Sequence, residues 1–331
     1  MNEPLRWGIL GTGRIARKFA GQLRQTNRAA LIAVGSRSRE SARHFAEELG
    51  VRAAYASYAA LVADPQIDAV YVSVPNALHC RWATAALDAG KHVLCEKPLA
   101  ADAAEAEAMF AAAEAAGRVL VEAFMYRCHP AVERILHMVH EGAVGRLKLI
   151  RTHFTFNRPD DEADVRYQPQ LAGGSLMDVG CYCVHFARAL AAAEPIAVHA
   201  FAQLHRSGVD EYAAGTLQFD GGVLSNFTCG MTVEADRTTF ICGSDGYLSV
   251  NNPWISDGTF HLFKADGRET IVQKATLAPH ALEAERFAAV VQDGAPAFVS
   301  KVDSLGNMKV LDELRRQVGL LPSKGASGRS E

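Results

Sequence analysis

The sequence predicts an α/β protein in which a parallel β-sheet comes first and a mainly antiparallel sheet follows. Up to residue 123, short apolar runs alternate with helical patterns, as in repeated strand-helix-strand units. Beyond residue 123, longer stretches alternate apolar and polar residues, which indicates antiparallel strands with one covered face. We therefore expect one domain over residues 1–123, a second over 124–321, and a disordered tail over 322–331.

The elements of the first domain follow from its apolar runs and from the segments between them. Buried parallel strands are predicted at residues 5–10, 31–35, 68–74, 91–95 and 119–124. Helices are predicted at residues 11–24, 78–89 and 102–116, the last two of which are rich in alanine.

In the second domain, a helix over residues 130–141 is expected to lead into the antiparallel sheet. Strands are predicted at residues 147–156, 197–206, 212–219 and 223–231. Turns at Asp220-Gly221-Gly222 and Asp245-Gly246 fit hairpins. One helix from Ser175 onward interrupts the sheet, and helices near residues 282–291 and 304–318 close the domain.

The composition excludes several classes of function. The chain has 331 residues and a net charge of −3, which favours neither nucleic acid nor an acidic membrane as partner. No stretch approaches the roughly 20 apolar residues of a membrane helix, and no cleavable signal is seen at the N-terminus. Seven scattered cysteines are typical of free thiols in a reducing compartment, so we expect a cytoplasmic protein.

No metal site is expected. Cys181 and Cys183 are two residues apart on a predicted helix, so they point in different directions. No matching pair of Cys or His residues completes a tetrahedral set with them.

A glycine-rich turn, Gly11-Thr12-Gly13-Arg14-Ile15-Ala16, directly follows the first strand and opens a helix. Glycines there let the backbone approach a pyrophosphate, whose charge is met by the helix N-terminus. Dinucleotide binding by Gly11, Thr12, Gly13, Arg14 and Ile15 is therefore predicted. The alternative is a glycine-rich turn without a ligand.

The tip of the second strand indicates which dinucleotide binds. The segment Gly35-Ser36-Arg37-Ser38-Arg39 has no acidic residue that would take the ribose 2′-hydroxyl of NAD. The hydroxyl of Ser36 and the guanidinium of Arg37 suit a 2′-phosphate, so NADP is predicted in preference to NAD. In the alternative interpretation the arginines only start a solvated helix.

Two further segments carry candidate catalytic side chains. Lys97 follows the apolar run 91–95, and ligands bind beyond the carboxyl ends of strands in open α/β sheets. Alone, however, it could be a solvated loop lysine. Asp178, Tyr182 and His185 stand at i, i+4 and i+7 of the predicted helix, along one face, and Ser175 is expected to cap its start.

Four motifs in fixed order resemble the Gfo/Idh/MocA oxidoreductase family. They are the glycine turn, Val74-Pro75-Asn76-Ala77-Leu78-His79, Cys95-Glu96-Lys97-Pro98 and Glu122-Ala123-Phe124-Met125-Tyr126-Arg127. The resemblance implies an N-terminal Rossmann domain and a C-terminal α+β domain with an open-faced, mainly antiparallel sheet. In the family this sheet commonly mediates oligomerisation, so a homodimer or homotetramer is expected.

The resemblance also implies an activity and site residues. The activity is hydride exchange between NAD(P) and a sugar, polyol or related alcohol. Pro75, Asn76 and His79 would line the cofactor cleft, Glu96 and Lys97 would lie near the nicotinamide, and the Lys97–Pro98 bond would be cis.

This chain has Tyr182 where the family usually has a histidine four residues after its aspartate. That departure matches a branch containing glucose-fructose oxidoreductase, dimeric dihydrodiol dehydrogenase and NADP-dependent D-xylose dehydrogenases. Tyrosine has an ordinary pKa of about 10, which an adjacent ammonium lowers. We therefore expect Tyr182 to exchange the proton, Lys97 to polarise it and the substrate oxygen, and Asp178 to orient the substrate hydroxyls or Lys97.

Further pocket residues and the reaction are less closely specified. Tyr126, Arg127, Phe154, Arg166 and His185 are candidates for substrate binding, although Phe154 could be sheet core and Arg166 a loop salt bridge. The expected reaction is NADP-dependent dehydrogenation of an aldose or a vicinal cyclic diol. Three alternatives are a glucose-fructose type oxidoreductase that holds NADP tightly, a glycosidase that uses NAD transiently, and a non-catalytic NADP-binding redox sensor.

Overall fold

The computed structural model describes residues 3–322 and divides the chain into two compact units. The first comprises Met1–His129 and Ala275–Ser304, and the second comprises Pro130–Lys274 and Leu305–Glu331. Residues 275–304, assigned to the second domain from the sequence, thus cluster with the first unit. Of the predicted disordered tail, residues 323–331 lie outside the described residues.

The first unit is built on a six-stranded parallel sheet with strand order β3-β2-β1-β4-β5-β6. This confirms the predicted Rossmann-type parallel sheet. The strands are β1 (Leu5–Leu10), β2 (Ala29–Gly35), β3 (Ala53–Tyr55), β4 (Ala69–Val72), β5 (His92–Glu96) and β6 (Leu120–Ala123). Strand β3 was not predicted because its three residues are too few to show a hydrophobic period.

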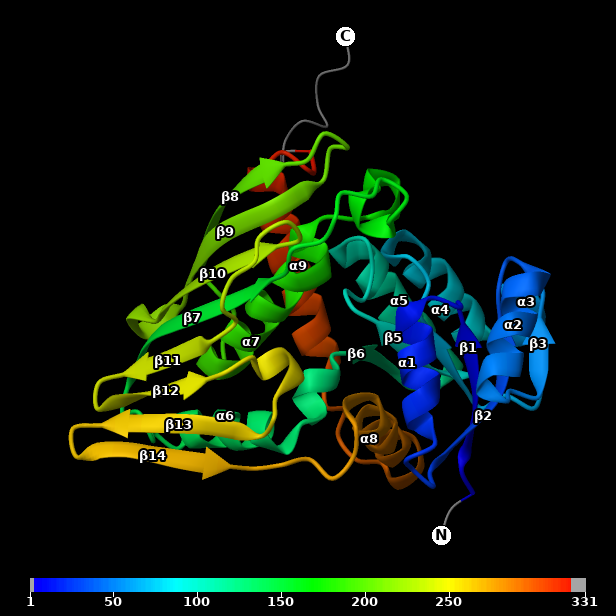
Figure 1. The fold of residues 1–331 in the computed structure, drawn as a ribbon, viewed down its shortest axis with the longest axis horizontal. Coiled ribbons are helices and arrows are strands. Elements are labelled where there is room, and N and C mark those ends of the chain that lie inside the picture. Colours follow the sequence, from blue (N-terminus) through cyan, green and yellow to red (C-terminus); the bar gives the residue numbers. More distant parts are fainter. Residues whose placement is uncertain (1–2, 323–331) are drawn as a thin grey trace. The chain divides into compact units, whose positions relative to one another are not determined.

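Helices connect these strands, as Figure 1 shows in blue and cyan. They are α1 (Arg14–Leu23), α2 (Arg39–Leu49), α3 (Tyr58–Val62), α4 (His79–Asp88) and α5 (Ala103–Ala116). Helix α8 (Pro279–Asp293), late in the sequence, packs against α1. Its Phe287 ring lies 5.1 Å from the ring of Trp7 in β1, which explains why this helix belongs to the first unit.

Helix α8 also brings two ionisable side chains into the apolar core. His280 and Glu283 are both buried, with 3.2 Å between His280 Nδ1 and Glu283 Oε2. Burial raises the pKa of Glu283 to about 8 and lowers the pKa of His280 to about 4. Near neutral pH, therefore, the core holds a protonated carboxyl group beside a neutral imidazole.

The second unit is built on an eight-stranded sheet with order β14-β13-β12-β11-β7-β10-β9-β8. Neighbouring strands are antiparallel except β7 and β10, which are parallel, so the predicted mainly antiparallel sheet is confirmed. The strands are β7 (Leu147–Thr155), β8 (Ala197–Leu204), β9 (Asp210–Gln218), β10 (Leu224–Gly230), β11 (Thr239–Gly243), β12 (Gly246–Val250), β13 (Thr259–Lys264) and β14 (Gly267–Val272).

One face of this sheet is covered by helix α7 (Cys181–Ala191), which packs against β7 and β10. Helix α6 (Pro130–His140) contacts α7. Helix α9 (Lys301–Gln317) reaches edge strand β8, because its Gln317 side chain bonds the backbone of Val198 and Ala200. Large apolar side chains remain exposed along the sheet, namely Phe201, Leu204, Tyr212, Leu224, Tyr247 and Val272.

Within the described part of the chain, no helix combines the length and the apolar character that crossing a membrane requires. Nor do residues 3–322 contain a cluster of three or more His, Cys, Asp or Glu side chains able to hold a metal ion.

The buried carboxyl group of Glu283 should make stability fall as pH rises. Its pKa in the folded protein, about 8, lies above the ordinary value of 4.5, so its contribution is complete below pH 4.5 and is lost as pH rises through 8. Glu283→Gln, which cannot ionise, should therefore gain stability relative to wild type between pH 5.5 and pH 8.5. Urea unfolding at both pH values measures this difference. The exposed Glu114→Gln serves as control, and parallel pH dependence of wild type and Glu283→Gln would contradict the assignment.

Candidate active site

The glycine turn has the geometry of a phosphate-binding loop. Gly11 adopts a φ of +108°, and a Cβ atom there would lie 2.9 Å from the carbonyl oxygen of Ser73, so only glycine fits. Gly13 occupies the N-cap of α1 and has no side chain with which to cap the helix. Thr12 lies between the two glycines, and Arg14 and Ile15 are the first two residues of α1. A helix N-terminus without a side-chain cap is the arrangement that receives a phosphate.

At the tip of β2 the polar side chains have separate roles. Ser36 is buried, and its hydroxyl accepts a hydrogen bond from Ser38 N at 3.3 Å. Ser38 caps α2 by accepting from Ser41 N at 3.2 Å. The helix begins at Arg39, whereas Arg37 lies before the cap and is exposed. The alternative considered from the sequence therefore holds for Arg39, which starts the helix and is exposed, but not for Arg37.

Lys97 directly follows β5, and the Lys97–Pro98 peptide bond is cis as expected. The neighbouring Glu96 is buried, its Oε2 accepting a hydrogen bond from Lys97 N at 3.3 Å and its Oε1 accepting one from the hydroxyl of Tyr71. Burial raises the pKa of Glu96, and the ammonium group of Lys97 opposes that shift. Glu96 therefore fixes the backbone from which the Lys97 side chain extends.

Two further buried side chains hold the same loop. Glu122 Oε1 accepts a hydrogen bond from Leu99 N at 2.9 Å. His79 lies with Nδ1 3.0 Å from the Pro98 carbonyl oxygen and Nε2 2.8 Å from the Val74 carbonyl oxygen. Burial lowers the pKa of His79 to about 4, so the ring is neutral near pH 7 and donates to one of these carbonyls at a time.

Several predicted cofactor residues follow the carboxyl ends of strands in the first sheet. Gly11, Pro75 and Lys97 follow the carboxyl ends of β1, β4 and β5, which are neighbours in the sheet. Asn76 begins a short 3₁₀ turn after Pro75. Tyr126 and Arg127 lie in the 3₁₀ turn Met125–Cys128 after β6, where Tyr126 is buried. In open parallel sheets, ligands bind beyond the carboxyl ends of the strands.

In the second unit, the structure brings two predicted substrate residues together. Asp178 lies in a π-helical turn, Leu176–Gly180, that leads into α7. Its Oδ2 accepts a hydrogen bond from Arg166 Nε at 2.6 Å, and both side chains are mostly buried. Burial opposes the charge of Arg166, but the carboxylates of Asp178 and Asp164 raise its pKa above the ordinary value. Arg166 therefore also forms the salt bridge that was considered as the alternative, with Asp178 as a partner.

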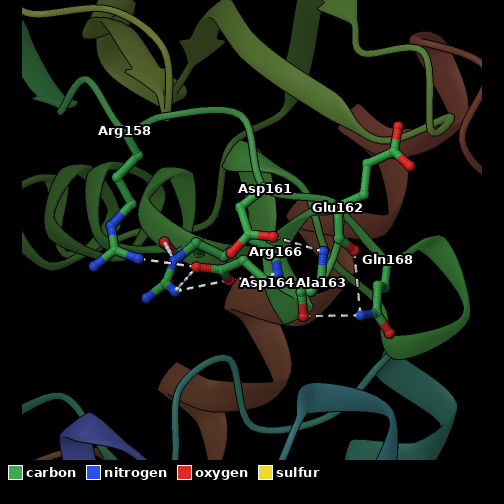
Figure 2. Close-up of polar contacts among 8 residues, drawn as sticks. Arg158, Asp161, Glu162, Ala163, Asp164, Arg166 and Gln168 are labelled. Atoms are coloured by element: carbon green, nitrogen blue, oxygen red, sulfur yellow. Dashed lines mark hydrogen bonds and ion pairs between the residues drawn. The ribbon is translucent and has the colours of Figure 1, made fainter.

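Figure 2 shows how the loop before the π-helical turn holds Arg166. Arg166 Nη1 lies 3.1 Å from Asp164 Oδ1, and Arg158 Nη1 lies 2.9 Å from Asp164 Oδ2. Burial opposes ionisation of Asp164, but hydrogen bonds and the charge of Arg166 hold its pKa below the usual range. The four groups alternate in sign from Asp178 to Arg158, so their formal charges cancel.

Tyr182 lies in the first turn of α7, and its ring is packed by two other aromatic rings. The ring centroid of Phe154 lies 5.2 Å away and that of Trp254 lies 5.7 Å away, both edge to face. Phe154 and Trp254 also stack on each other. His185 is buried one turn further along α7. The sequence analysis did not identify Trp254 as a site residue, because no periodic pattern marks its segment. The tryptophan itself was the signal that could have indicated it.

The prediction that Ser175 caps the helix is wrong. Ser175 is itself in helical conformation and makes no side-chain cap. Its hydroxyl instead donates to Asp210 Oδ2 at 2.7 Å, and the same carboxylate oxygen accepts from Leu176 N at 2.6 Å.

Comparisons with known proteins agree with this architecture. The oxidoreductase family with an NAD-binding Rossmann fold, GFO/IDH/MocA, matches residues 5–124, and the C-terminal domain of that family matches residues 132–249. D-xylose 1-dehydrogenase (NADP+) 2 from Haloferax volcanii is 38% identical over 93% of this chain and 95% of that protein. Trans-1,2-dihydrobenzene-1,2-diol dehydrogenase from Mus musculus is 33% identical over 76% of this chain and 75% of that protein.

Two solved structures are similar over nearly the whole chain. A 3-ketoreductase from Actinomadura kijaniata, in complex with NADP and TDP-benzene, is 30% identical with a TM-score of 0.86, covering 95% of this chain and 98% of that one. An aldose-aldose oxidoreductase from Caulobacter crescentus, complexed with glycerol, is 27% identical with a TM-score of 0.88, covering 95% and 97%. The resemblance seen in the sequence is confirmed, and the chain belongs to the GFO/IDH/MocA oxidoreductase family.

Proposed function

We propose that the protein is an NADP-dependent dehydrogenase that transfers a hydride between the nicotinamide and a hydroxyl of a neutral aldose or vicinal cyclic diol. The observation that carries this proposal is the charge-balanced pair of Asp178 and Arg166, which lies on the elements leading to Tyr182. The similarity to an NADP-dependent D-xylose dehydrogenase and a dihydrodiol dehydrogenase supports the substrate class.

The preference for NADP rests on the tip of β2. No acidic side chain stands there to bind a ribose 2′-hydroxyl, and the exposed guanidinium of Arg37 precedes the capped start of α2. Ser36 is buried, whereas Arg37 is exposed and its guanidinium makes charge-assisted hydrogen bonds, so Arg37 is the stronger candidate for a 2′-phosphate. The xylose dehydrogenase relative, which uses NADP, is consistent with this choice.

The chemistry requires a proton acceptor as well as a hydride acceptor. Bound NADP supplies the hydride acceptor at its nicotinamide ring. We assign the proton to the phenol oxygen of Tyr182, whose ring is held in one orientation by Phe154 and Trp254. Lys97, on the loop fixed by Glu96 and other buried side chains, would stabilise the phenolate and polarise the substrate oxygen.

The charges around Asp178 favour a neutral substrate over an acidic one. The guanidinium of Arg166 already pairs with Asp178 and Asp164, so it has little net positive charge to offer a carboxylate or phosphate. A hydroxyl group can donate to the carboxylate of Asp178 and accept from a guanidinium at once. Vicinal hydroxyls therefore match this pair better than sugar acids or sugar phosphates do.

A second candidate function is oxidation of one sugar coupled to reduction of another, with NADP held throughout. The similarity to an aldose-aldose oxidoreductase favours it. Denaturing the purified protein distinguishes the two, because stoichiometric release of nucleotide indicates a retained cofactor. A dehydrogenase that exchanges NADP should release much less.

We further propose a cytoplasmic homo-oligomer. The seven cysteines are free, as expected for a reducing compartment. The apolar side chains exposed on the second sheet, including Phe201 and Tyr212, are suited to burial against a second copy of the chain.

Removing either proposed catalytic group should abolish most of the turnover. Tyr182→Phe deletes the proton acceptor while keeping the ring, and Lys97→Met deletes the ammonium while keeping much of the side-chain volume. Each should lower kcat for NADP reduction by about 10²–10⁴-fold, with NADP affinity largely retained. Steady-state rates across aldoses, inositols, anhydro-sugars and cyclic diols, with fluorescence titration of NADP, provide the measurement. Near-native turnover in both variants would reject the assignment.

Arg37→Ala should reduce the discrimination between cofactors. A hydrogen bond to a charged group contributes about 1.5–3 kcal/mol, so the ratio of kcat/KM for NADP to that for NAD should fall at least about tenfold. The neighbouring Arg39→Ala, which alters the first residue of α2, is the control. Equal or better efficiency of the wild-type enzyme with NAD would show that the cofactor assignment is mistaken.

A further inference from the structure

We propose that Asp210 is a positioning residue that sets the place of Asp178 and Tyr182, an inference that rests on the proposed function. Asp210 is the first residue of β9, far from both in sequence, and it is completely buried. Its Oδ2 accepts hydrogen bonds from Ser175 Oγ at 2.7 Å and from Leu176 N at 2.6 Å. Both donors belong to the start of the helical segment that carries the two catalytic candidates.

The helical segment needs an acceptor at this point. The first amides of a helix have no carbonyl partner within the helix. Ser175, the N-cap residue of the π-helical turn, makes no side-chain cap hydrogen bond. Asp210 therefore supplies the missing acceptor from another strand, and its negative charge suits the positive end of the helix. The position of the turn is thereby tied to β9.

The same carboxylate also packs against the loop that carries Arg166. Gly174 has a φ of +106°, and a Cβ atom at that residue would lie 2.1 Å from Asp210 Oδ1. Gly174 N donates to the Arg166 carbonyl oxygen at 2.9 Å, and Gly174 O accepts from Asp178 N at 2.9 Å. Gly174 thus joins Arg166 and Asp178 through the backbone, directly beside Asp210. A shift of this segment would move both members of the Asp178–Arg166 pair.

Asp210 is sufficiently acidic for this role near neutral pH. Burial raises its pKa to about 6, and the hydrogen bonds from Ser175 and Leu176 oppose that shift. Arg315 in α9, whose charge also lowers this pKa, is itself paired with Asp312 at 3.6 Å. The carboxylate consequently remains ionised above pH 7 and keeps both hydrogen bonds.

The test compares Asp210→Ala and Asp210→Asn with a matched cap variant, Ser300→Ala. Ser300 caps α9 by accepting from Asp303 N at 3.1 Å, as Asp210 accepts from an amide at the start of the π-helical turn. Turnover with NADP and the best aldose of the substrate panel is corrected for the folded fraction, and NADP affinity is titrated in parallel. Because a displacement of about 1 Å can cost 10²-fold in rate, Asp210→Ala should lose about 10- to 100-fold in kcat with NADP affinity retained.

Asp210→Asn should recover part of this loss, since its amide oxygen can still accept from Ser175 and Leu176. If the alanine variant does not fold, Asp210→Asn tests the proposal in its place. Ser300→Ala should lose stability but keep the kcat of its folded fraction. A loss of activity in the Asp210 variants no larger than the loss of folded protein would overturn the proposal.

A double-mutant cycle separates positioning from general damage. If Asp210 acts through Tyr182, Asp210→Asn should cause little further loss of kcat in the Tyr182→Phe background. Losses that multiply in full would contradict action through Tyr182. Near-native turnover of the single variant Tyr182→Phe would instead refute the proposed function itself. Failure of the proposed function is thus measured on Tyr182→Phe, and failure of the positioning role on the Asp210 variants.

Discussion

Buried backbone amides must find hydrogen-bond acceptors, and in this protein buried carboxylates provide them where the candidate catalytic segments leave regular structure. Glu96 and Glu122 accept from Lys97 N and Leu99 N in the loop after β5. Asp210 accepts from Leu176 N at the start of the π-helical turn. Each carboxylate belongs to a strand. A segment that bears a proposed catalytic side chain is thus anchored to a sheet by a hydrogen bond.

Charge compensation complements this backbone support in the second unit. The carboxylate of Asp178 is costly to bury alone, and the guanidinium of Arg166 makes its burial acceptable. Asp164 in turn orients Arg166 and joins it to Arg158. The alternating charges of this row cancel formally, and the proposed preference for neutral substrates rests on this balance. On helix α7, which follows the π-helical turn, the rings of Phe154 and Trp254 pack against the ring of Tyr182.

The sequence predicted what depends on local spacing and failed where distant contacts decide. The glycine turn and the parallel sheet were expected from local patterns, and the cis bond at Lys97 was implied by the family resemblance. Strands β11 to β14 were missed apart from their Asp245-Gly246 turn, since each has only five or six residues. The role of Asp210 could not be foreseen, because its partners lie more than thirty residues away and Ser175 offered a local cap that the structure does not use.

The assignment of proton exchange to Tyr182, assisted by Lys97, is the central claim, and a crystal structure of the ternary complex with NADP and a neutral aldose tests it most directly. The account predicts that the reacting hydroxyl lies beside C4 of the nicotinamide and within hydrogen-bond distance of both Tyr182 Oη and Lys97 Nζ. It also predicts that a neighbouring hydroxyl contacts Asp178 or Arg166. A reacting hydroxyl bound to His185, or to any other side chain with Tyr182 out of reach, would contradict it.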